Sequence, residues 1–145
     1  MNNCTKITIR RPVTEVFEAF VDPLKIGNFW FSSSSERWEQ GKAITLTYDE
    51  YDAQVDIQVL GIKANQEICF QWGTAGEGHV VTISLKDLDG SSTLVEVNEE
   101  GFHEDDENLI VNLVDNKEGW VYMLTCLKAY VEFGVNQLRA GLVKG

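Results

Sequence analysis

The sequence predicts an α+β protein in which one curved antiparallel sheet surrounds a long C-terminal helix. The first observation is that apolar residues recur at every second position between Ala43 and Asn98, as they do in strands with one buried face. The second is that they recur at helical spacing over residues 105–133. So wide an apolar stripe needs an apolar surface to cover it, and the apolar face of the predicted sheet provides one. Because sheets twist and curl, we expect the helix to lie in the concave side.

The N-terminal part of the chain predicts one strand and two short helices. Residues 4–10 alternate between apolar and polar side chains, which is typical of a half-buried strand. Residues 11–23 carry an apolar stripe at helical spacing, and Pro12 stands in the first turn, where proline is tolerated. The stretch "PLKIGNFWF" (23–31) predicts the second short helix, and the serine run at 32–35 predicts a loop.

About five more strands follow, and short turns separate them. Their alternating apolar positions are Ile44, Leu46, Tyr48; Val55, Ile57, Val59; Ile68, Phe70, Trp72; Val81, Ile83, Leu85; and those of "STLVEVNEEGF" (92–102). Consecutive strands with short turns form an antiparallel meander, and the first strand is expected to pair at its far edge. The glycine-rich "GTAGEG" (73–78) joins two strands and precedes no helix, so it predicts a hairpin turn and not a phosphate-binding loop.

The last predicted element is the helix at 105–133. Its acidic residues at 105–107 are expected in the first turn, where carboxylates suit the helix dipole. Lys128 and Glu132 are spaced for an i,i+4 ion pair on the wetter face. Gly134 is the expected end of the helix, although the chain beyond it can also continue as a helix after a kink. The buried stripe is expected to comprise Trp120, Leu124, Leu127 and Val131, widened by Met123, Tyr130 and Leu138.

Length and charge limit the class of protein. The chain has 145 residues, and residues 1–145 are predicted to form a single domain. Its 12 basic and 23 acidic residues give a formal charge of −11, which disfavours nucleic acids and anionic membranes as partners. No signal-peptide pattern and no apolar run of about 20 residues is visible. We therefore expect a cytoplasmic protein in which Cys4, Cys69 and Cys126 are free thiols.

Four segments together resemble a known family. They are "RPVTEVFEAFVDPLKIGNFW" (11–30), "EICFQWG" (67–73), "HVVTISLKDLDGSSTLVEVNEEGF" (79–102) and "EGWVYMLTCLKAYVEFG" (118–134). Their order and spacing resemble the activator of Hsp90 ATPase homologue 1-like family. That family belongs to the START-like (SRPBCC), helix-grip superfamily, which also holds Bet v 1-type and polyketide cyclase-like proteins. The resemblance implies a cavity between the sheet and the long helix, often used for apolar ligands, and it implies no universal catalytic residues.

The cavity candidates are the bulky side chains predicted to point between the sheet and the helix. Tryptophan and tyrosine carry a polar group that needs a partner when buried, which suits a pocket that is mainly apolar. The alternative is that these side chains simply fill the core. The candidates are Trp30, Tyr48, Phe70, Trp72, His79, Trp120, Met123, Leu124 and Leu127.

Three functions are weighed. The first is the binding of an unidentified small apolar or amphipathic molecule, neutral or cationic because the protein is acidic. The second is a stress-related or co-chaperone-like domain that binds a protein partner, and the third is a cyclase- or dehydratase-like enzyme. An enzyme needs an acid or base in the cavity, for which only His79, Tyr48 and Glu96 are candidates. No metal or other cofactor is expected, because neither His79 nor His103 has further ligands at the right spacing, and the protein is expected to be a monomer or homodimer.

Overall fold

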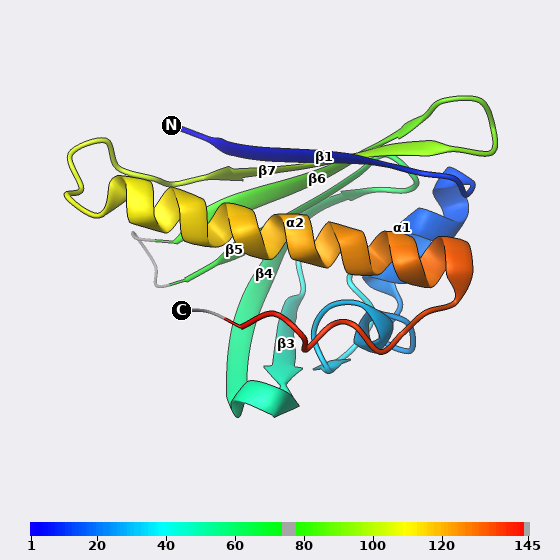
Figure 1. Cartoon of the computed structure of the whole chain (residues 1–145), viewed down its shortest axis with the longest axis horizontal. Coiled ribbons are helices and arrows are strands. Elements are labelled where there is room, and N and C mark those ends of the chain that lie inside the picture. The colour runs from blue at the N-terminus through cyan, green and yellow to red at the C-terminus, as the bar shows by residue number, and fades with distance from the viewer. Residues whose placement is uncertain (74–77, 144–145) are drawn as a thin grey trace.

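The protein is a curved antiparallel sheet with a long helix lying across its concave side (Figure 1). The structure is a computed structural model that describes residues 1–73 and 78–143. Within these residues the elements follow the order β1 (Asn3–Ile9), α1 (Val13–Val21), η1 (Ile26–Asn28), β2 (Ser33–Ser34), β3 (Ala43–Tyr48), η2 (Asp49–Tyr51), β4 (Ala53–Lys63), β5 (Glu67–Trp72), β6 (His79–Asp87), β7 (Thr93–Glu100) and α2 (Leu109–Phe133).

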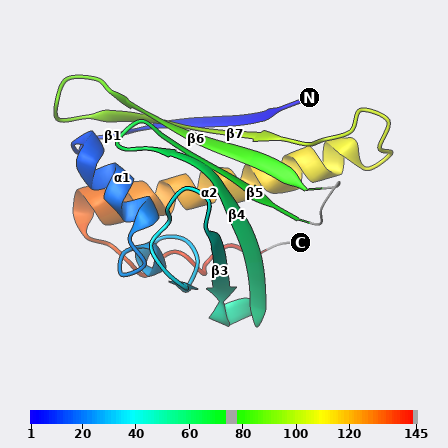
Figure 2. The ribbon, with the colours of Figure 1, turned by 180° about the vertical axis from the view of Figure 1, so that it is seen from behind.

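The sheet has the predicted topology. Its seven described strands lie in the order β1-β7-β6-β5-β4-β3-β2, and every neighbouring pair is antiparallel. The prediction that the first strand pairs at the far edge of the meander is confirmed, since β1 lies beside β7. Seen from behind, the sheet covers the middle of α2 and α1 covers one end (Figure 2). The predicted turn at 73–78 falls largely on residues 74–77, which lie outside the described residues.

Apolar side chains on the concave face of the sheet form the core with α1 and α2. The alternating positions of each strand are buried as predicted, among them Ile44, Ile68 and Val81. From α2 the residues Trp120 and Leu127 are buried against them. The apolar stripe of α2 is therefore covered by the sheet, as predicted.

Three local predictions were wrong. The long helix begins at Leu109 and not at 105, because Asp106 forms a turn before it, accepting a hydrogen bond from the Asn108 backbone N–H at 2.8 Å. The second short helix is only the three-residue η1, a 3₁₀ turn. The serine run predicted as a loop contains β2, which pairs with β3 at the edge of the sheet.

The chain turns back on itself after α2. Gly134 adopts φ +70°, and its N–H donates to the Tyr130 carbonyl at 2.9 Å. This bond from the left-handed glycine to the carbonyl four residues back is that of an αL C-cap, and the N–H of Val135 donates to the Ala129 carbonyl at 3.1 Å. Gly134 is thus the end of the helix, as predicted, and residues 135–143 do not continue it. They run back along α2 towards β3 (Figure 1). The expectation that Leu138 widens the buried stripe was therefore wrong, since this residue lies beyond the helix and is 43% exposed.

Other features bear on the protein's surroundings. In the described part of the chain, no helix is both long and apolar enough to span a membrane. Cys4, Cys69 and Cys126 carry free thiols, and burial raises the pKa of the Cys126 thiol. The predicted pair of Lys128 and Glu132 is present, and the lysine together with a backbone N–H holds the pKa of the Glu132 carboxyl below its ordinary value despite partial desolvation.

Candidate functional site: an aromatic cavity between sheet and helix

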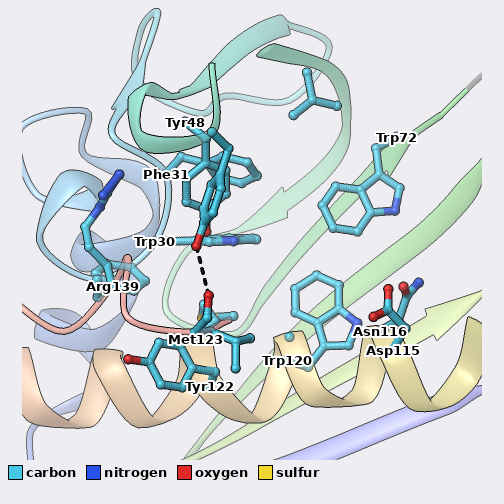
Figure 3. A pocket seen from close by; sticks show the side chains of 15 residues that line it. Trp30, Phe31, Tyr48, Trp72, Asp115, Asn116, Trp120, Tyr122, Met123 and Arg139 are labelled. Atoms are coloured by element: carbon cyan, nitrogen blue, oxygen red, sulfur yellow. Dashed lines mark hydrogen bonds between the residues drawn. The ribbon is translucent and has the colours of Figure 1, made fainter. Parts of the chain in front are cut away.

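A cavity of about 470 Å³ lies between the sheet and α2. One wall comes from β3, β5 and the segment after η1, and the floor comes from α2 (Figure 3). The C-terminal segment contributes the remaining side. The aromatic side chains that line it are Phe29, Trp30, Phe31, Tyr48, Tyr51, Trp72, Trp120 and Tyr122.

Two tryptophans close one side of the cavity. Trp72 of β5 and Trp120 of α2 stack with their centroids 5.3 Å apart and their planes 21° apart. Trp30 packs edge-on against Trp120 at 5.8 Å. Because Trp72 and Trp120 touch each other, the open space does not lie between them. It lies beside them, towards Tyr48 and Phe31 (Figure 3).

Arg139 stands at the end of the cavity near Tyr48. Its guanidinium donates two hydrogen bonds to the Glu50 carboxylate, at 2.6 and 3.0 Å, so its charge is paired. The guanidinium carbon lies 5.5 Å from the centre of the Tyr48 ring, within the range of a cation–π contact. Burial raises the pKa of the Tyr48 hydroxyl to about 12, so this group stays neutral at physiological pH.

The C-terminal segment lies over the cavity and is held by side chains of η2 and α2. The Tyr51 hydroxyl donates to the Leu142 carbonyl at 3.1 Å (dashed line in Figure 3). The Tyr122 hydroxyl of α2 donates to the Leu138 carbonyl at 2.5 Å. Together with the bonds from Arg139, these contacts place the side chain of Leu142 on the cavity wall.

A buried carboxylate supports the opposite end. Glu99 of β7 is 0% exposed, and its oxygens accept a hydrogen bond from the Trp120 indole N–H at 2.8 Å. The Asn116 amide nitrogen lies 3.1 and 3.2 Å from the same two oxygens. Nδ1 of His79 lies 2.7 Å from Oε2. Trp120 and Asn116 both line the cavity, whereas Glu99 and His79 lie behind them.

The predicted cavity candidates fall into three groups. Those on the cavity wall are Trp30, Tyr48, Trp72, Trp120 and Met123. Those that lie in the packed core instead are Phe70, Leu124 and Leu127. The last, His79, bonds to Glu99 away from the wall, because β6 begins at the rim of the sheet.

Glu96 does not point into the cavity. It lies on the outer face of β7, where its carboxylate is 3.4 Å from the Lys6 ammonium and accepts a weak hydrogen bond from the Cys4 thiol. Side chains alternate along a strand, so the acid that faces α2 is Glu99, three positions on. Its neighbours on that face are Val95 and Val97. No group of three or more metal-binding side chains occurs among the residues that the structure describes.

Several cavity residues were not predicted from the sequence. Phe31 lies beyond the end of η1, in a segment predicted as helix, and Tyr51 ends the short η2, where periodicity gives no facing direction. Arg139 and Leu142 lie beyond the helix end, and nothing in their local sequence shows that this segment folds back. Asn116 reads as a polar residue on the exposed side of the helix, and only its distance to Glu99 reveals its position.

A curved sheet closed by one long helix, with a cavity between them, defines the class of helix-grip α+β proteins. Within this class the chain belongs to the Activator of Hsp90 ATPase homolog 1-like protein family, whose model matches residues 10–132. The resemblance of the four sequence segments is therefore confirmed. Among curated proteins, none matches the chain.

Solved structures agree with this assignment. The protein SSP2350 from Staphylococcus saprophyticus is 50% identical, with a TM-score of 0.83, and the match covers 94% of this chain and 95% of that one. The Aha1 dimer from Colwellia psychrerythraea is 18% identical, with a TM-score of 0.79 and coverage of 92% and 98%. CalU16 from Micromonospora echinospora is 19% identical, with a TM-score of 0.71 and coverage of 90% and 73%. At these lower identities the last two show a common fold alone.

Proposed function

We propose that the protein binds a small, neutral apolar or amphipathic molecule in the cavity between the sheet and α2. The observation that carries this proposal is the cavity itself. Its volume of about 470 Å³ falls within the roughly 300–1,000 Å³ of small-molecule sites. Its walls are mainly aromatic, with a few polar groups at the ends, which is the usual composition of such sites.

The charges around the cavity favour a neutral guest. Of the two charged side chains on its wall, Arg139 is paired with Glu50, so it offers little net attraction for an anion. The other, Asp115, is acidic. The formal charge of −11 on the whole chain acts in the same direction, since it repels anions at long range. A neutral or weakly cationic molecule therefore fits better than a fatty-acid anion.

The test is direct binding of naphthalene, a neutral aromatic probe, followed by tryptophan fluorescence. A guest in contact with Trp72 and Trp120 changes their emission. It also stabilises the folded protein by RT ln(1 + [L]/Kd), about 2.7 kcal/mol at a hundredfold excess over Kd. Native mass spectrometry of protein purified from its own host then looks for the natural guest.

A cavity-filling variant supplies the control for this test. Val55→Trp introduces an indole at a position on the cavity wall and is expected to abolish probe binding. Val114→Trp makes the same change on an exposed position of α2 and is expected to leave binding intact. Binding that survives Val55→Trp, or a wild-type protein that binds no apolar probe, contradicts the proposal.

One observation favours a second candidate, self-association through α2. The side chains of Ile110, Val111 and Val114 are 74%, 67% and 60% exposed, an unusual exposure for neighbouring aliphatic residues on one helix. The similar structure from Colwellia psychrerythraea is described as a dimer. Sedimentation equilibrium of wild type and Val114→Asp tests this: a dimer that the aspartate dissociates supports it, and a wild-type monomer at high concentration excludes it.

A further inference from the structure

Glu99 is out of place in its strand. On the concave face of β7 it follows Val95 and Val97, which are both buried in the core, and it is itself 0% exposed. Burying a carboxylate is unfavourable unless hydrogen-bond donors replace the water it loses. The side chain is therefore held in this position by its partners.

The partners of Glu99 come from two different elements. Trp120 and Asn116 reach it from α2, at 2.8 Å and at 3.1 and 3.2 Å, and His79 reaches it from β6 at 2.7 Å. A carboxylate in this setting accepts hydrogen bonds from all three. The four side chains form the Glu99 cluster, which joins the sheet to the helix directly behind the cavity wall.

The backbone makes room for this cluster. Gly101 has φ +116°, and a Cβ atom built there would lie 2.7 Å from Cδ2 of His79. A larger residue at 101 would therefore displace the imidazole from Glu99. The left-handed conformation at Gly101 excludes most other residues in any case.

The chemistry of the carboxylate fixes which way the Asn116 amide faces. The two carboxylate oxygens of Glu99 act as acceptors, and the Asn116 amide turns its NH₂ group towards them, at 3.1 and 3.2 Å. The amide oxygen then faces away from Glu99. The only polar hydrogen of the Trp120 indole is also used by Glu99. What Trp120 and Asn116 can offer a guest is therefore an acceptor, the Asn116 amide oxygen, beside the carboxylate of Asp115 on the same wall.

We propose that Glu99 is a positioning residue that makes the cavity select guests carrying an O–H or N–H donor. It acts through Asn116 and Trp120 and does not itself touch the guest. This inference rests on the proposed binding function and adds the polar group that the guest must carry. The guest class it defines is a neutral aromatic or apolar molecule with a hydroxyl or amine hydrogen near one end.

Three matched probes separate the two proposals. Naphthalene measures apolar binding alone, 2-naphthol adds a donor, and 2-methoxynaphthalene has the same oxygen without the hydrogen. In Glu99→Gln the new amide can donate, so Asn116 is free to turn its oxygen towards residue 99 and its NH₂ towards the cavity. We expect the ratio of naphthol to methoxynaphthalene affinity to fall about two- to tenfold relative to wild type, the worth of one hydrogen bond. Naphthalene affinity is expected to stay close to that of wild type.

Two further variants make the result interpretable. Glu96→Gln changes the same residue type on the outer face of the same strand and is expected to leave the ratio unchanged. Asn116→Leu removes the acceptor while Glu99 keeps two of its donors, and it is expected to lower the ratio as Glu99→Gln does. Asn116→Leu therefore tests donor selection even if Glu99→Gln does not fold.

A nuclear magnetic resonance signal shows whether Glu99 positions Trp120 in the protein without a guest. The indole N–H resonance of Trp120, hydrogen-bonded to a carboxylate, is expected far downfield and is expected to move upfield in Glu99→Gln but not in Glu96→Gln. An unmoved resonance overturns the positioning role. A ratio that is the same in wild type, Glu99→Gln and Asn116→Leu overturns donor selection while naphthalene still binds. Failure of all three probes to bind wild type overturns the binding function, and donor selection with it.

Discussion

Replacing Trp120 by phenylalanine tests whether Glu99 is a buried anion. The change removes one ring of the indole and the N–H that donates to Glu99 at 2.8 Å. Loss of the buried ring costs about 1–2 kcal/mol, and loss of a hydrogen bond to a charged group costs about 1.5–3 kcal/mol. We therefore expect the free energy of unfolding to fall by about 2.5–5 kcal/mol.

Trp38→Phe is the matched comparison. Trp38 is as deeply buried as Trp120, but its indole N–H donates to the neutral Ser34 hydroxyl, at 3.2 Å. A neutral hydrogen bond is worth about 0.5–1.5 kcal/mol, so this variant is expected to lose about 1.5–3.5 kcal/mol, which is about 1–1.5 kcal/mol less than Trp120→Phe. Urea unfolding measures both values, provided that the m-value stays constant between variants. Equal losses, or a larger loss in Trp38→Phe, would refute the interpretation of Glu99 as a charged acceptor.

Three other outcomes follow from the structure. Leu127→Ala, in the buried stripe of α2, is expected to lower the free energy of unfolding by about 2–5 kcal/mol in urea titrations, and a loss below about 1 kcal/mol would contradict the packing of α2 in the sheet. Arg139→Ala is expected to speed hydrogen exchange at the Gly141 amide, because the C-terminal segment loses its bonds to Glu50. Arg37→Ala breaks a similar two-bond pair elsewhere and is expected to leave that exchange rate unchanged. For Tyr48 the folded pKa of about 12 exceeds the ordinary tyrosine pKa of 10.0. Its neutral form therefore contributes stability that is fully present below pH 10.0 and is lost as the pH rises towards 12. Tyrosinate absorbance of wild type and Tyr48→Phe, read between these limits, is expected to differ little if Tyr48 is still protonated.

The regular elements were predictable because each is specified by its own residues. The alternation in β3 to β7 fixes which side chains are buried, and a shift by one residue would turn the whole apolar set to solvent. The sheet order followed from short turns between the strands. The stripe on α2 and the turn at Gly134 were likewise local signals, and the structure has both. The failure at residues 105–107 came from a side chain, Asp106, that forms a turn of its own.

The cavity was only partly predictable because it depends on contacts between distant segments. Five residues on its wall, four aromatic ones and Met123, were predicted because the periodicity of their strand or helix turns them towards the interior. The same periodicity does not distinguish the cavity wall from the packed core beneath it, where Phe70 lies. Glu99 was missed because it breaks the apolar pattern of its strand, and its partners lie 17 to 21 positions away. The covering segment with Arg139 was missed since its direction is set by side chains of β3, η2 and α2, not by its own sequence.

The stacked pair of Trp72 and Trp120 gives the protein a spectroscopic signal that reports the distance between the sheet and α2. One ring belongs to the sheet and the other to the helix, and their centroids lie 5.3 Å apart. At such a separation the electronic transitions of two indoles couple, and the coupled pair gives a circular dichroism couplet whose size depends on distance and tilt. Any guest that moves α2 relative to β5 therefore alters this signal, without a label and without a mutation. The protein can thus be screened for its guest by the way it absorbs circularly polarised light.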